Sequence, residues 1–100
     1  MEGTKRYERI SLKDMQSAVQ HRRMAAFWDE KRKEYPGPQE FGAFRDTVSY
    51  NYMNPANVSE EDALNEEAPQ GYRMISRDVS EFMGVRFVSY LFEQPATPPN

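Results

Sequence analysis

The sequence predicts an α+β fold in which a long N-terminal helix packs on a small, mostly antiparallel three-stranded sheet with short connecting helices. Two observations lead to this fold class. Helix formers run without a break from residue 11 to residue 34. Three later segments, 46–53, 72–76 and 85–92, have the composition or the alternation of strands. A chain of 100 residues supports one core, so we expect a single domain over residues 1–100.

The long helix has the clearest boundaries. Ser11 is a good N-cap, and Asp14 three residues later stands at the reciprocal capping position. Ile10 and Met15 occupy the positions of a hydrophobic staple. The run Tyr-Pro-Gly-Pro at residues 35–38 ends the helix, because proline lacks the N–H donor and restricts the residue before it.

Capping patterns also predict the short helices. Pro38 can open a helical turn. Ser59 precedes three acidic residues and predicts a helix that ends near Glu67. Asp78 can cap a single helical turn, and Gly84 suits a left-handed exit from it.

The strand patterns differ in strength. In segment 46–53, Val48, Tyr50 and Tyr52 point to one side and polar residues to the other. Segment 85–92 is apolar on both faces, which indicates a central strand or one covered on its second face by a partner. The order of helices and strands also allows a mixed sheet, so the order of the strands stays open.

The chain ends differ from the middle. Residues 1–10 are polar and charged, and we expect an extended N-terminal arm. The folded core is expected over residues 11–92, followed by a proline-rich C-terminal tail over residues 93–100.

Composition argues against an enzyme. The chain has no cysteine, which excludes disulfides, thiolate metal sites and cysteine nucleophiles. Its one histidine, His21, has no companion for a metal cluster and no nucleophile motif. The glycines form no phosphate-binding loop. We therefore predict no catalytic residues, no metal site, no cofactor and no small-molecule substrate.

Hydropathy predicts a cytoplasmic location. No apolar run reaches the roughly 18 residues of a membrane span, and the N-terminus lacks the apolar stretch of a secretory signal. Charge is unevenly distributed within the net −3. Residues 1–35 hold nine basic and six acidic side chains, whereas residues 36–100 hold four and ten. The basic and the acidic half of the chain can neutralise each other's charge, or they can attract and orient a charged partner.

The long helix carries two apolar lines. One line, at helical spacing, is suited to packing on the sheet. Its members are Leu12, Met15, Val19 and Ala26. Met24, Trp28 and Tyr35 lie on roughly the opposite side. Three interpretations stay open. Phe41, Phe44 and segment 54–71 can cover the second line, the line can bind a partner, or the helix can break near Arg23.

These patterns favour a non-enzymatic protein-protein interaction module. We expect a small accessory, inhibitory or structural subunit of a larger assembly, of a kind common among viral and phage proteins. Its partner would be another protein or a second copy, bound through Met24, Trp28 and Tyr35 with Arg22 and Arg23 beside them.

The alternative is a nucleic-acid binder. It would use Arg22 and Arg23, which have no acidic neighbour in the sequence, together with the sheet tyrosines Tyr50 and Tyr52. An isoelectric point near 5.2 disfavours this alternative, because acidic surfaces repel phosphate.

Overall fold

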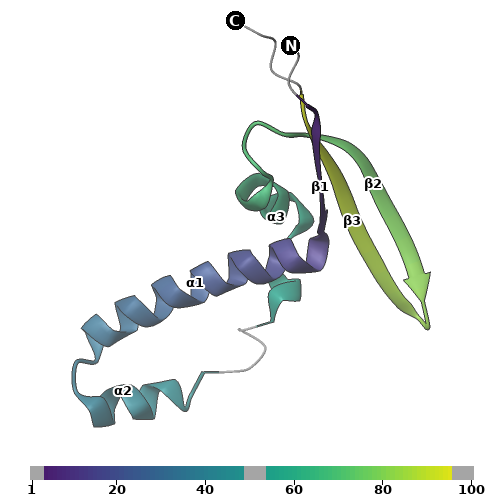
Figure 1. The fold of residues 1–100 in the computed structure, drawn as a ribbon. Helices are drawn as coiled ribbons and strands as arrows, with labels where there is room; N and C mark the ends of the chain where they lie inside the picture. The colour runs from purple at the N-terminus through teal and green to yellow at the C-terminus, as the bar shows by residue number, and fades with distance from the viewer. Residues whose placement is uncertain (1–3, 49–53, 96–100) are drawn as a thin grey trace, which may run out of the picture.

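The long helix forms where the sequence predicts it. A computed structural model describes residues 4–48 and 54–95, and in it α1 spans Leu12–Glu34 (Figure 1). The hydroxyl of Ser11 accepts a hydrogen bond from the N–H of Asp14 at 3.0 Å, as the capping pattern requires. The N–H of Tyr35 makes the last helical bond, to the carbonyl of Lys31. The helix is unbroken at Arg23.

The sheet is antiparallel and has three strands. These are β1 (Arg6–Ser11), β2 (Arg73–Phe82) and β3 (Val85–Gln94), in the spatial order β1-β3-β2. The predicted α+β fold class is confirmed. So is the central position of β3, whose two apolar faces indicated it.

The N-terminal arm belongs to the sheet. Residues 6–11 pair with β3 from Arg6 opposite Gln94 to Ser11 opposite Ser89. The composition of residues 6–11 is a weak signal for a strand, because only Ile10 supplies an aliphatic side chain to the packed face of β1. Backbone pairing holds such a strand, and an edge position tolerates its charges.

The strand β2 is longer than predicted. A helical turn starting at Asp78 was expected, and this prediction is wrong: residues 73–82 form one strand paired with β3. The local capping pattern competes with long-range pairing, and here the pairing prevails. Asp78 instead binds Arg9 of β1, with Nη1 to Oδ2 at 3.0 Å.

Among the described residues, the connections contain two short α-helices and a 3₁₀ turn. These are α2 (Pro38–Arg45), the 3₁₀ turn η2 (Pro55–Asn57) and α3 (Glu60–Glu67), which Ser59 caps as predicted. The strand predicted over residues 46–53 is wrong for its first part, since a turn after α2 takes up 46 and 47 and no strand includes Val48. Its other residues, with Tyr50 and Tyr52, lie outside the described residues.

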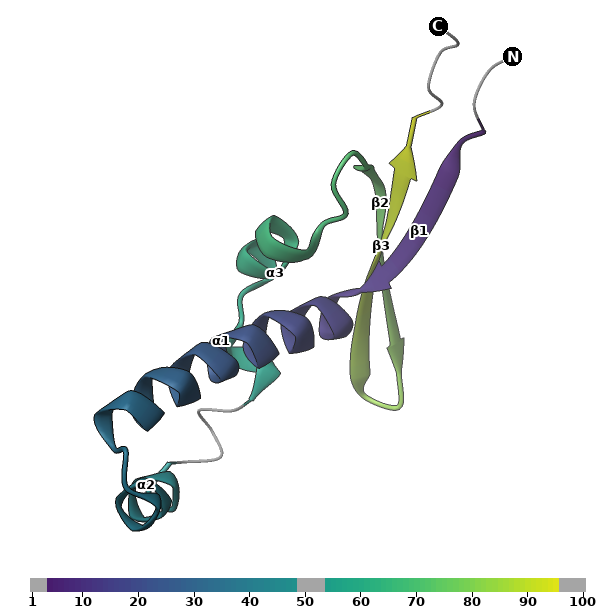
Figure 2. The same cartoon turned by 60° about the vertical axis from the view of Figure 1, so that its left-hand side comes forward.

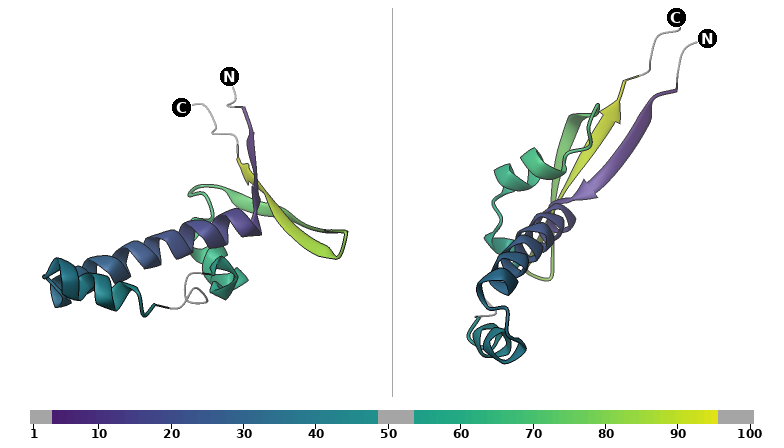
Figure 3. Two further views of the ribbon diagram at one scale, coloured as in Figure 1. Left: turned by 90° about the horizontal axis from the view of Figure 1, so that it is seen from below. Right: turned by 90° about the vertical axis from the view of Figure 1, so that its left-hand side faces the viewer.

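The buried core is small and lies on one face of the sheet. It combines side chains from α1, the η2–α3 region and β3. Its members are Met15, Val19, Val58, Ala63, Tyr90 and Phe92. Figures 1 and 3 show α1 and α3 on the same side of the sheet. Only the N-terminal half of α1 contributes to this core, and its other half leads away with α2 (Figure 2).

The resulting shape is elongated. The radius of gyration is 19.0 Å and the extents are 62 × 43 × 16 Å, whereas a compact chain of this length has a radius near 13 Å. The end of the β2–β3 hairpin projects on one side and the α1–α2 pair on the other (Figures 2 and 3). The division into one domain with flanking arm and tail stays a prediction, although Glu93 and Gln94 belong to β3.

Candidate interaction surfaces

The second apolar line of α1 meets α2. The ring centroid of Trp28 lies 5.8 Å from that of Phe41 and 6.2 Å from that of Phe44. Tyr35 stacks on Phe44 at 4.9 Å with an angle of 16° between the planes. Phe41 and Phe44 thus cover Trp28, as one of the interpretations above expected.

This aromatic cluster remains half-exposed, because no residue of α2 is buried. Met24, one helical turn before Trp28, lines a groove with Gln20, Arg23 and Asn57. Trp28 and Tyr35 are thus partly covered by α2, whereas Met24 lines that groove. Their role in partner binding stays a prediction.

Arg22 and Arg23 face α3. Nη1 of Arg22 donates to Glu67, and Nη2 of Arg23 lies 3.1 Å from Asp62 and 3.2 Å from Glu66. The hydrogen bond to Glu67 is the main cause that raises the pKa of Arg22. The acidic partners that the neighbouring sequence does not supply come from residues about 40 positions later in the chain. The basic helix and the acidic helix neutralise each other.

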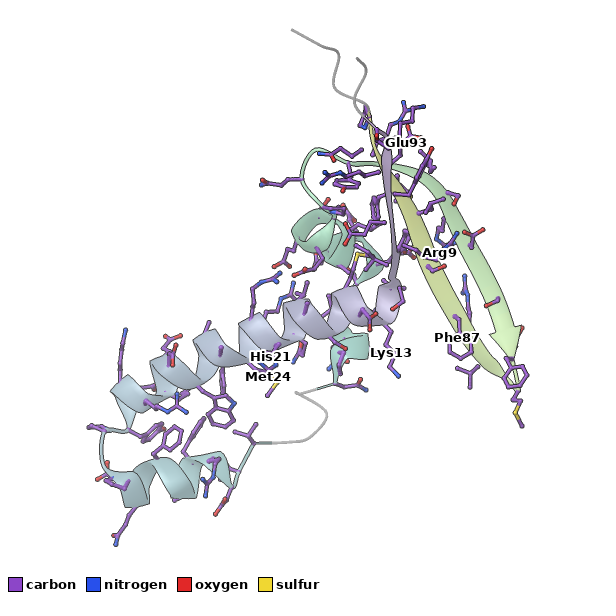
Figure 4. All side chains as sticks on the ribbon, in the orientation of Figure 1. Arg9, Lys13, His21, Met24, Phe87 and Glu93 are labelled. Atoms are coloured by element: carbon purple, nitrogen blue, oxygen red, sulfur yellow. The ribbon has the colours of Figure 1, made fainter. Side chains whose placement is uncertain are left out.

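Among the described residues, several exposed large apolar side chains lie elsewhere, at the end of the β2–β3 hairpin. We call them the hairpin patch. It consists of Phe82, Met83, Val85 and Phe87. Phe82 is 69% exposed and Met83 is 86% exposed. Figure 4 labels Phe87 on the part of the sheet near the end of the hairpin.

The turn of this hairpin uses an unusual residue. Met83 and Gly84 have φ values of 51° and 78°, the pattern of a two-residue type I′ turn. Asparagine, aspartate and glycine adopt this conformation most readily, whereas methionine pays a steric penalty there. A flexible apolar side chain is therefore held at the tip in spite of local backbone preference.

A groove of about 400 Å³ adjoins this patch. Its walls are the first turn of α1, with Leu12, Lys13 and Gln16, and residues 85–89 of β3. Figure 4 labels Lys13 and Phe87 on its two sides. Since β1 ends opposite Ser89, residues 85–88 of β3 have β2 on one edge and this groove on the other.

One polar cluster lies beside the core. The phenol of Tyr90 donates to Glu60, and Nε of Arg77 donates to the same carboxylate at 2.7 Å. The hydrogen bond from Arg77 is the main cause that lowers the pKa of Glu60, while burial raises the pKa of Tyr90 to about 12. Both groups therefore keep one protonation state around neutral pH, which suits a structural role better than proton transfer.

Within residues 4–48 and 54–95, no helix is long and apolar enough to cross a membrane. The same residues contain no group of three or more histidine, aspartate or glutamate side chains arranged to hold a metal ion. No family model, curated protein or solved structure matches the chain.

Sequence reasoning missed the hairpin patch for an identifiable reason. In the run Phe-Met-Gly-Val at residues 82–85, Gly84 was interpreted as the exit of a helical turn and Val85 as the start of a strand. An apolar pair flanking a glycine-containing dipeptide is also a hairpin signal. Once segment 73–82 is recognised as a strand, the same run places large apolar side chains at a solvent-exposed tip.

Proposed function

We propose that this protein is a non-enzymatic protein-protein interaction subunit that binds its partner through the hairpin patch. The observation that carries the proposal is the exposure of four large apolar side chains at one projecting end of the sheet. Contiguous apolar surface on a soluble chain marks interaction sites, and aromatic residues and methionine are enriched at the centres of interfaces.

The backbone at the tip adds support. Met83 occupies a left-handed position that asparagine would adopt at lower energy. A residue kept against local preference points to a contact outside the chain, since the side chain is 86% exposed.

The nucleic-acid alternative receives less support. Arg22 and Arg23 already bind acidic side chains of α3. A phosphate would have to displace those carboxylates or bind beside them, at an unfavourable potential.

The test is affinity capture with the full chain from its native source, compared across three variants. Met83→Asn should keep or raise stability, because asparagine suits the turn, and should weaken capture of the partner. Phe82→Ser should weaken it further. The double variant Met24→Ala, Trp28→Ala probes the helix surface predicted from the sequence.

The proposal is supported if both hairpin variants lose the partner while the helix variant still captures it. Loss in the helix variant alone, with an unchanged circular dichroism spectrum, would move the interface to Met24 and Trp28. A captured nucleic acid whose affinity falls steeply with added salt would favour the other class of function.

A further inference from the structure

The hydrogen-bonding pattern of the hairpin identifies an open edge. In a two-residue hairpin the residues that flank the turn, Phe82 and Val85, form a hydrogen-bonded pair. Alternation along the strand then turns the backbone N–H and C=O of Arg86 and Val88 away from β2. They point toward the groove beside α1, and β1 ends before it reaches them.

This open stretch continues the line of β1. An added strand placed there would follow β1 along the same edge of β3, over about 14 Å at the usual rise of a strand. Its alternate side chains would lie beside Val85 and Phe87, which are 53% and 50% exposed. The side chains between them would lie beside Arg86 and face the first turn of α1.

Charge determines what kind of segment fits. Among the described residues, two cations, Lys13 and Arg86, line the groove, and no acidic side chain does. Neither cation forms an ion pair with any residue the structure describes. Glu81 stands opposite Arg86, but it belongs to β2, on the far side of β3 from the groove. The groove is therefore apolar on one side and cationic on the other.

The same charges disfavour a second copy. If two molecules paired through this edge, Lys13 and Arg86 of both would gather at one place, and like charges facing each other across strands are destabilising. Cationic side chains on an open edge protect against self-association while they attract acidic segments.

We propose that the open edge of β3 at residues 85–88 binds an extended acidic segment of a partner protein as an added strand. The segment places apolar side chains beside Val85 and Phe87, and an acidic side chain between them reaches Lys13 and Arg86. This inference rests on the proposed function and specifies how the partner docks at the hairpin.

The experiment uses the full chain and two synthetic hexapeptides, one alternating valine with glutamate and one alternating valine with lysine. Titration with the glutamate peptide should shift the backbone amide resonances of residues 85–88 and of the first turn of α1 in a saturable way. Hydrogen exchange should slow most at the amides of Arg86 and Val88. The lysine peptide should bind roughly tenfold more weakly, as expected for losing two partly exposed charge pairs.

Two modified peptides test the strand pairing itself. In an added strand only alternate amides face β3, so N-methylation of that set should abolish binding, whereas methylation of the other set should leave it intact. Equal binding of the two methylated peptides overturns the proposal. So does the absence of saturable shifts at residues 85–88.

The charge argument is tested with Lys13→Glu, Arg86→Gln. This double variant should lose the preference for glutamate over lysine. The matched control, Lys33→Glu, Arg45→Gln, makes the same change in net charge at the far end of the molecule and should keep it. If sedimentation of the free protein shows a dimer that the Lys13→Glu, Arg86→Gln change strengthens, the occupant is a second copy and the acidic-segment proposal is wrong.

The two proposals can fail separately. A partner that depends on Phe82 and Met83 but still binds Lys13→Glu, Arg86→Gln keeps the proposed function and overturns the edge inference. A partner that binds the hairpin variants as tightly as the wild-type protein overturns the proposed function.

Discussion

The two halves of β3 are similarly apolar, and their surroundings differ. Tyr90 and Phe92 are almost completely buried under α1 and α3, with a strand on either side. Val85 and Phe87 are about half exposed and have only β2 beside them. Hydrophobicity alone therefore does not decide burial here. What decides it is strand alternation, which puts Val85 and Phe87 on the face opposite the helix-covered core, together with the end of β1, which leaves residues 85–88 without a strand on that edge.

The largest expected effect separates these halves directly. Phe92→Ala should destabilise the fold by about 3–5 kcal/mol, because it opens a cavity in a small core. Phe87→Ala should change the free energy of unfolding by less than about 1 kcal/mol, as usual for exposed positions. Urea denaturation of both variants measures the difference. Equal losses would mean that the hairpin end is covered in solution.

A second prediction contrasts the core with the far end of α1. Trp28→Ala should release α2 at a local loss of about 1–2 kcal/mol, since two aromatic contacts disappear while the sheet core is untouched. Hydrogen exchange should accelerate in residues 38–45 and stay slow in β3. The matched variant Trp28→Phe should retain most of the protection. Faster exchange throughout the chain would show that α2 and the sheet unfold as one unit.

The smallest expected effect concerns the polar cluster that borders the buried half. The lowered pKa of Glu60 means that the folded state binds its proton less readily than the unfolded chain, whose value is near 4.5. The carboxylate therefore contributes stability above that pH, and the contribution is lost as the pH falls through the lowered pKa. Because the side chain is 37% exposed, we expect less than about 1 kcal/mol.

Glu60→Gln provides the measurement. The wild-type protein should be more stable than the variant at neutral pH. The difference between their free energies of unfolding should decrease gradually as the pH falls below 4.5. A difference that is constant with pH would assign the effect to packing rather than to charge. The control Glu61→Gln makes the same substitution at a neighbouring carboxylate whose side chain forms no ion pair with the described residues.

Several features follow from local sequence alone. Ser11 and the stop at residues 35–38 define α1, and Ser59 defines the start of α3, because capping and proline restriction act within one turn of the chain. The central place of β3 was one of two interpretations of its apolar faces, the other being cover by a partner, and the order of the strands stayed open.

Other features depended on residues far apart in the chain. β1 is recognisable only from its pairing with β3, and the acidic partners of Arg22 and Arg23 come from α3. The open edge at residues 85–88 exists because β1 ends opposite Ser89. The register in which β1 pairs with β3 determines this end point. Helix capping and intrinsic propensity depend on neighbouring residues and can be read from the sequence. Strand register and helix docking depend on contacts between distant residues and are determined only when strands and helices pack together.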